Sequence, residues 1–135
     1  MDRLRAIHKW TTRWDDHTVI IHICSRAEWD AVPAEGQYRA ASLDDVGFIH
    51  CSDPGTVALP ANSLYRDRAD LVLLEVDPTR VNAQVRWEDG VPAHPDGIWF
   101  PHVYGPIPRN AVVAVHDFPA EPDGSRKLPA ALSVR

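Results

Sequence analysis

Two short stretches of the chain share one pattern, an apolar run that ends on a histidine just before a helix-start signal. The β-branched run 18–24 carries His22, and Ser25 follows it with a glutamate three residues later, which is the spacing of a capping box. The stretch 47–52 carries His50 and leads into a serine, aspartate and proline typical of a helix start. Both histidines are therefore predicted at strand ends, where open sheets place ligands and reactive side chains.

Length and charge bound what the chain can be. Its 135 residues suit a single domain with one core, and its formal net charge of -5 argues against general binding to the nucleic-acid backbone. No apolar run approaches the length of a membrane span, and residues 1–16 lack the apolar stretch of a secretory signal. We therefore expect a cytoplasmic protein whose two cysteines, Cys24 and Cys51, are unpaired thiols.

Further strands complete the predicted fold. The strongest strand prediction covers residues 70–77, because its apolar residues are leucines and β-branched valines in a nearly continuous run. The run 18–24 is expected to be a central strand. Shorter strands are predicted at 37–40, 85–88 and 111–116, and a turn is predicted at 77–80.

The remaining segments are predicted to be less regular. Residues 56–65 have helical composition, but Pro60 predicts a kink or break. The segment 89–110 is rich in proline and glycine, and loops of that length are often functional. Residues 1–17 are interpreted as an N-terminal extension, either a short helix or disordered, and residues 119–135 as a frayed C-terminal tail.

Neighbouring histidines and cysteines raise the question of a metal site or a thiol nucleophile. His22 and Cys24 would point to one face of a strand, whereas His50 and Cys51 would point to opposite faces. Because the paired spacings of structural zinc sites are absent, we predict no metal site and keep a metal-stabilised domain as the weakest alternative. The apolar neighbours of both cysteines favour buried, inert thiols.

Two further features leave alternatives open. Glu75 lies inside an apolar strand, and it is either a buried site residue with partners or a residue that faces solvent at an edge. The stretch 99–104 places His102 and Tyr104 on a segment that reads as a proline-stiffened loop. We expect this loop to border the same cleft as the two strand-end histidines; the alternative is that its rings cover one edge of the core.

The order of these motifs along residues 18–118 resembles DUF952, a family of small bacterial proteins. The segments that carry the resemblance are 22–29, 38–43, 47–52, 71–77, 85–88 and 100–108. The family's fold resembles that of ADP-ribosyltransferases, and its strand-end histidines are similar to those of RNA 2'-phosphotransferases. The resemblance implies a single α+β domain with short helices and a mixed, mostly antiparallel, two-sheet core.

The resemblance also implies a nucleotide site. His22 would contact a ribose of NAD, and His50 with Ser52 would form the second binding motif. Ser25 and Tyr104 complete the predicted set of cofactor-binding residues. Neither histidine motif supplies an aromatic face for a nicotinamide ring, which is why a tyrosine is included.

Catalysis would fall to Glu75 and His102, with Glu88 a further candidate on chemical grounds. Cleavage of the nicotinamide–ribose bond passes through an oxocarbenium-like centre, which a carboxylate stabilises. The arginine pair that RNA 2'-phosphotransferases use on a 2'-phosphate is absent from this sequence. The leading hypothesis is an NAD-dependent ADP-ribosyl-transferring enzyme with an unknown acceptor. The alternative is a non-catalytic module that binds a nucleotide-like ligand or a protein partner in the same cleft.

Overall fold

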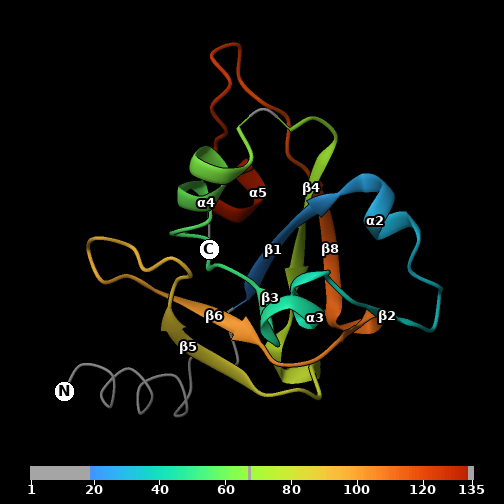
Figure 1. The fold of residues 1–135 in the computed structure, drawn as a ribbon. Helices are drawn as coiled ribbons and strands as arrows, with labels where there is room; N and C mark the ends of the chain where they lie inside the picture. Colours follow the sequence, from blue (N-terminus) through green and yellow to red (C-terminus); the bar gives the residue numbers. More distant parts are fainter. Residues whose placement is uncertain (1–18, 67, 134–135) are drawn as a thin grey trace.

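A computed structural model describes residues 19–66 and 68–133, drawn as a ribbon in Figure 1. The helical segments are α2 Arg26–Asp30, α3 Ser42–Val46, α4 Ala58–Leu64, η2 Pro78–Arg80, η3 Arg109–Ala111 and α5 Ala130–Ser133. The strands are β1 Ile20–Ser25, β2 Gln37–Tyr38, β3 Ile49–His50, β4 Leu71–Val76, β5 Val85–Asp89, β6 Trp99–Val103, β7 Ile107–Pro108 and β8 Val112–Asp117. The predicted N-terminal extension lies outside the described residues.

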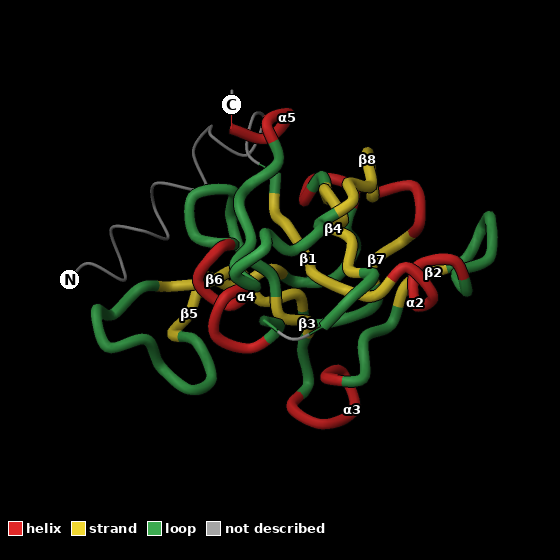
Figure 2. The backbone as a smooth tube through the Cα atoms, turned by 90° about the horizontal axis from the view of Figure 1, so that it is seen from above, coloured by secondary structure: helices red, strands yellow, loops and turns green. Residues whose placement is uncertain are grey.

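The described strands pair antiparallel in three sheets, with strand orders β1-β4-β8, β3-β6-β5 and β2-β7. The prediction of a single α+β domain with mostly antiparallel strands and short helices is confirmed. The structure adds the small β2-β7 sheet to the two larger ones. Figure 2 shows β4 between β1 and β8. The prediction of a central strand at 18–24 is therefore wrong, because β1 is an edge strand of its sheet and β4 is the central one.

Both faces of the β1-β4-β8 sheet are buried, which explains why β4 is apolar along nearly its whole length. One face packs with Trp29 of α2 and with the β3-β6-β5 sheet, through Ile20, Cys24, Val72, Leu74 and Val76. The opposite face packs against α4 and the C-terminal segment, through Ile21, Ile23, Leu71 and Leu73. Each fully buried side chain of this kind contributes about 1.5–3 kcal/mol.

Two predictions about irregular backbone are wrong, for physical reasons. Helix α4 begins at Ala58, so Pro60 falls in its first turn, where backbone N–H groups have no acceptor within the helix. The helix is therefore continuous through the proline. Residues 99–103 form strand β6 at the centre of its sheet and not a loop. The carbonyl of Pro101 accepts the Cys51 amide at 3.1 Å, so the proline costs the sheet only its missing donor.

The C-terminal segment is not frayed as predicted. Leu132 is 1% exposed and packs with Phe118 in the cluster on the α4 side of the central sheet. Arg126 is 3% exposed, and its guanidinium donates to the Tyr65 carbonyl at the end of α4 and to the Phe118 carbonyl just after β8. A buried arginine thus fastens this segment to the body of the domain.

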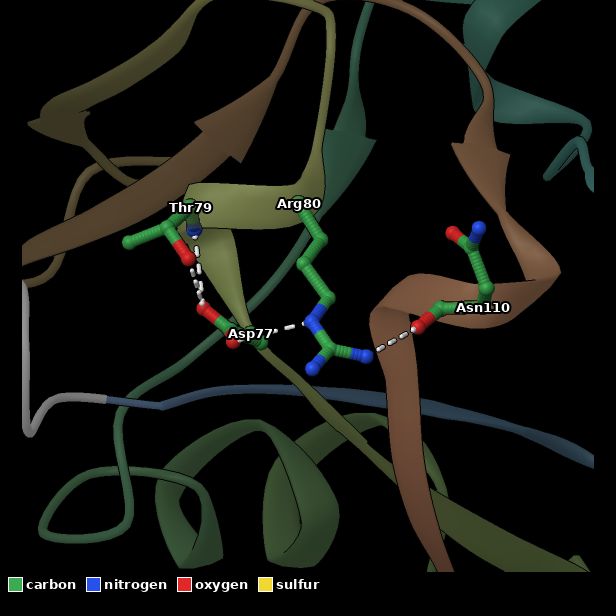
Figure 3. A network of polar contacts seen from close by, with 4 residues as sticks. All are labelled: Asp77, Thr79, Arg80 and Asn110. Atoms are coloured by element: carbon green, nitrogen blue, oxygen red, sulfur yellow. Dashed lines mark hydrogen bonds and ion pairs between the residues drawn. The ribbon is translucent and has the colours of Figure 1, made fainter.

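The predicted turn at 77–80 is confirmed as η2, and Figure 3 shows the polar network that fixes it. Oδ1 of Asp77 accepts the backbone N–H of Thr79 at 2.9 Å and the Thr79 hydroxyl at 2.7 Å. Nε of Arg80 lies 3.5 Å from the Asp77 carboxylate, and its Nη1 donates to the Asn110 carbonyl at 3.3 Å. The network links the end of β4 to the turn that precedes β8.

Candidate functional site

The β3-β6-β5 sheet has one apolar face in the core and one face that carries rings and charges. Ile49, Val103 and Val85 lie opposite one another on the core side. Because side chains alternate along a strand, the intervening positions share the other face. We call this surface the histidine face; it consists of Phe48, His50, Arg86, Glu88, Phe100, His102 and Tyr104.

A carboxylate of this face holds two side chains of the neighbouring strand. Oε1 of Glu88 accepts the Tyr104 hydroxyl at 2.6 Å and lies 2.8 Å from Nδ1 of His102. An ionised carboxylate can only accept hydrogen bonds, so Nδ1 of His102 must carry the proton that points to Glu88. When the ring is neutral, Nε2 then carries the lone pair. Burial acts to raise the pKa of Glu88, but the hydrogen bonds from Tyr104 and His102 outweigh it, and the pKa is lowered. The hydrogen bond to Glu88, with burial second, raises the pKa of Tyr104.

Ring contacts fix the two histidines relative to each other. Phe48 stacks on His102 with ring centroids 4.0 Å apart and an interplanar angle of 16°. His50 meets His102 edge-on, with centroids 5.6 Å apart and an angle of 80°. Burial, and then the neighbouring His102, lowers the pKa of His50. His50 therefore presents a neutral ring at neutral pH, able to donate and to accept a hydrogen bond.

A cavity of about 610 Å³ opens beside one end of the histidine face. Sites for small organic ligands typically have about 300–1,000 Å³ and mostly apolar walls with a few polar groups. The walls here come from β1, α4, the loop 90–95 and β6, with Phe100 and Tyr65 as the rings. Among the described residues that line it, none is acidic and none is a lysine or arginine.

Three of the predicted site residues meet at this cavity: His50, Ser52 and His102. Ser52 is fixed by a two-way backbone pair with Ile21, with N···O distances of 2.7 and 2.6 Å. Tyr104 belongs to the histidine face but does not line the cavity. The expectation that the stretch 99–104 borders the cleft thus holds for His102, while the aromatic wall is Phe100.

His22 does not line the cavity, so the prediction that His22 and His50 line one cleft is wrong, although the two residues are in contact. His22 also lies in the middle of β1 and not at a strand end as predicted. His22 is 5% exposed; its Nδ1 lies 2.6 Å from the His50 carbonyl and its Nε2 lies 2.7 Å from the Tyr38 hydroxyl. A carbonyl can only accept, so Nδ1 donates to it and Nε2 accepts from Tyr38. Burial lowers the pKa of His22 to about 4, which keeps the ring neutral. In this arrangement His22 holds the end of β3 in place.

Two other predicted residues also lie away from the cavity. Ser25 caps α2: its hydroxyl accepts the Glu28 amide at 3.0 Å, and the Glu28 carboxylate accepts the Ser25 amide at 2.8 Å. The predicted capping box is thereby confirmed. Glu75 is 2% exposed and lies 2.9 Å from Nε2 of His116 on β8. This placement selects the buried alternative for Glu75, and the binding and catalytic roles of both residues stay predictions.

Neither cysteine is paired, as predicted, and both are buried. Burial raises the pKa of Cys24 to about 12, and it raises the pKa of Cys51 as well. Both side chains are therefore neutral thiols near neutral pH, which does not suit a nucleophile. In the part of the chain that the structure describes, no group of three histidine, cysteine or acidic side chains is placed to hold a metal ion. No helix among those residues is long and apolar enough to cross a membrane.

Sequence reasoning did not identify the Glu88–His102 pair or the segments that form the cavity walls. Glu88 was a candidate on chemical grounds alone, because its pairing with His102 depends on strand register across the loop 90–98. The alternation of Arg86 and Glu88 along one strand was the available signal that they share a face. No sequence pattern indicated that α4 and the loop 90–95 form cavity walls, because their apolar side chains could equally belong to the core.

These features define a small α+β domain with three antiparallel sheets and a histidine-bearing cavity. The chain belongs to the family described as "Protein of unknown function (DUF952)", which matches residues 23–115. It is 34% identical to protein CC0527 from Caulobacter crescentus, whose crystal structure superposes with a TM-score of 0.74 and covers 86% of this chain and 99% of that chain. The solution NMR structure of CC0527 gives 33% identity, a TM-score of 0.70, and coverage of 87% and 98%. No curated protein matches the chain.

Proposed function

We propose that the protein binds NAD or a closely related nucleotide in the cavity beside the histidine face, and that it transfers the ADP-ribosyl group to an acceptor. The ADP-ribosyltransferase-like interpretation of the fold forms part of this proposal. The observation that carries it is the Glu88–His102 pair, 2.8 Å apart, whose histidine lines a cavity of about 610 Å³ together with His50.

The walls of the cavity suit the parts of such a ligand. Phe100 and Tyr65 offer ring surfaces for a flat base, and face-to-edge or offset contacts between rings add about 0.5–1.5 kcal/mol each. His50 and Ser52 are among the lining residues, and a neutral imidazole and a hydroxyl can bond to ribose hydroxyls. The backbone pair between Ser52 and Ile21 and the buried His22 fix these groups before a ligand arrives, which reduces the entropic cost of binding.

The chemistry supported here is glycosyl transfer. The acceptor's nucleophile forms a bond to the anomeric carbon of the ribose as the bond to nicotinamide breaks, and nicotinamide leaves as a neutral base. His102, held through Nδ1 by Glu88, would take the acceptor's proton on Nε2. The Glu88 carboxylate does not line the cavity; with its lowered pKa, it would stabilise the positive charge that forms on His102 when the ring takes that proton. Glu88 thus takes the carboxylate role in this scheme, and the role of Glu75 stays an independent prediction.

One observation favours a second candidate, a module that binds the nucleotide without turning it over. No carboxylate is among the described residues that line the cavity, and Glu88 reaches the cavity only through His102. A glycosyl-transferring site places a carboxylate beside the reacting carbon. Binding and catalysis must therefore be measured separately.

Calorimetric titration with NAD and with ADP-ribose, alongside an assay for nicotinamide release, tests both candidates. We expect both ligands to bind, and the variant His50→Ala to bind about tenfold more weakly, because it loses a ring contact and a hydrogen bond. His116→Gln is the matched control, since His116 lies outside the cavity and glutamine retains a donor for Glu75. Binding without nicotinamide release would select the binding module. Absence of binding for both ligands would overturn the proposal.

A further inference from the structure

We infer that Arg86 and Tyr104 form an anion subsite on the histidine face, next to the cavity, and that this subsite takes a phosphate group of the bound nucleotide. The inference rests on the proposed function and deepens it, because it requires the ligand to be a phosphorylated nucleoside. It assigns the apolar cavity to the base and ribose, and the open end of the same sheet face to the phosphate.

The composition of the cavity wall raises the need for such a subsite. No lysine or arginine is among the described residues that line the cavity, and the chain as a whole has a formal net charge of -5. An anionic ligand is repelled by such a protein unless a local positive charge attracts it. The cation that binds the phosphate must therefore stand just outside the cavity.

Arg86 stands at that place in the sheet. Its Cα pairs with that of His102 across β5 and β6, so the two side chains are neighbours on the histidine face. His102 in turn lines the cavity, and His50, which is exposed, lies opposite it on β3. The cross-strand pair of Arg86 and His102 lies two residues along the strands from the pair that contains Phe100. At the usual strand rise, this separation is about 7 Å. One ribose can bridge that separation between a base and its phosphate.

The guanidinium of Arg86 is oriented by the ring of Tyr104. It lies 4.6 Å from the ring centroid of Tyr104, whose hydroxyl is held by Glu88 at 2.6 Å. Stacking occupies one flat side of a guanidinium and leaves N–H groups along its edge for the paired hydrogen bonds that a phosphate accepts. Among the ion pairs of the described residues, none involves Arg86.

Glu88 is the charge on this face that opposes a phosphate. Its Oε1 already accepts from both Tyr104 and His102, so part of its charge is engaged within the protein. Arg86 also acts on Glu88 at a distance and helps to lower its pKa. The subsite therefore depends on the guanidinium, and loss of that one side chain leaves a face that repels anions.

The test is a comparison of adenosine, AMP and inorganic pyrophosphate as ligands of the full chain, by calorimetry and by amide and arginine side-chain NMR signals. We expect AMP to bind at least about tenfold more tightly than adenosine, which is the usual effect of a charged hydrogen-bonded contact. The variant Arg86→Gln should remove this difference and leave adenosine binding unchanged. Arg80→Gln, which removes the same charge from the η2 turn, is the matched control and should retain the difference.

The outcomes separate this inference from the proposed function. Equal affinity of the wild-type protein for adenosine and AMP would overturn the phosphate subsite and leave nucleoside binding in the cavity intact. Pyrophosphate shifts centred on Arg86 and Tyr104, with no binding of adenosine or AMP, would support the subsite and count against the nucleotide cavity. No response to any of the three ligands would overturn both. A phosphate-dependent gain that survives in Arg86→Gln would also overturn the subsite.

Discussion

Replacing Arg126 with methionine is expected to lower the free energy of unfolding by about 3 kcal/mol, because a buried hydrogen-bonded charge leaves unpaired groups behind when it is removed. Arg126 is 3% exposed, and its guanidinium donates from Nε to the Phe118 carbonyl at 2.9 Å and from Nη1 to the Tyr65 carbonyl at 2.6 Å. Its Nη2 also donates to the carbonyl of Arg68. Tyr65 is the C-cap of α4, where helix carbonyls lack partners and a positive charge is favourable.

Urea unfolding at neutral pH, followed by fluorescence and circular dichroism, measures this change. Arg66→Met is the matched control: Arg66 is exposed and donates one hydrogen bond to the Asp123 carbonyl at 2.9 Å, so its loss should cost well under half as much. Equal destabilisation by the two variants would show that Arg126 does not anchor the C-terminal segment.

Acidification is expected to remove about 3 kcal/mol of stability through His22 alone as the pH falls from 6.5 to about 4. Burial lowers the pKa of His22 from 6.5 to about 4 in the folded protein. Over that interval the unfolded chain binds a proton that the folded chain excludes, so acid favours unfolding. The stabilisation is complete above pH 6.5 and is lost progressively down to about pH 4; a gap of that size corresponds to about 3 kcal/mol.

The variant His22→Gln isolates this effect from the carboxylates, which titrate in both proteins. Glutamine can still donate to the His50 carbonyl and accept from Tyr38, but it does not titrate. We expect the wild-type protein to be the more stable of the two at pH 7, with its advantage shrinking by about 3 kcal/mol by pH 4. An advantage that stays constant across this range would contradict this prediction, because it would mean that His22 takes up its proton as readily in the folded protein as in the unfolded chain.

Local sequence patterns predicted the elements that depend on neighbours in the chain. The capping box at Ser25, the turn at Asp77 and the buried strand β4 all follow from short-range spacing and appear as expected. The pattern predicted both histidines at strand ends, but only His50 ends its strand, and His22 lies inside β1. His22 is enclosed by Tyr38 and a backbone carbonyl, whereas His50 is exposed at the cavity, and the two stretches look alike in sequence.

The features that escaped prediction depend on contacts between distant segments. Pro101 made the segment 99–103 resemble a loop, yet the strand survives because one missing donor is a small loss beside two flanking strands. The Glu88–His102 pair arises from register across a loop whose geometry the sequence does not specify. Arg126 resembled one of many surface charges, and only the fold reveals the carbonyls that converge on it.

The central claim, that a nucleotide binds in the cavity beside the histidine face, is tested most directly by mapping NAD on the ¹⁵N-labelled full chain by NMR. We predict saturable shifts of the amides of Ser52, Val91 and His102, which border the cavity, with much smaller shifts at Trp29 and His116, which do not. His50→Ala should weaken this response without moving it elsewhere. Shifts that centre on Trp29 or His116, or no saturable shifts at millimolar NAD, would contradict the claim.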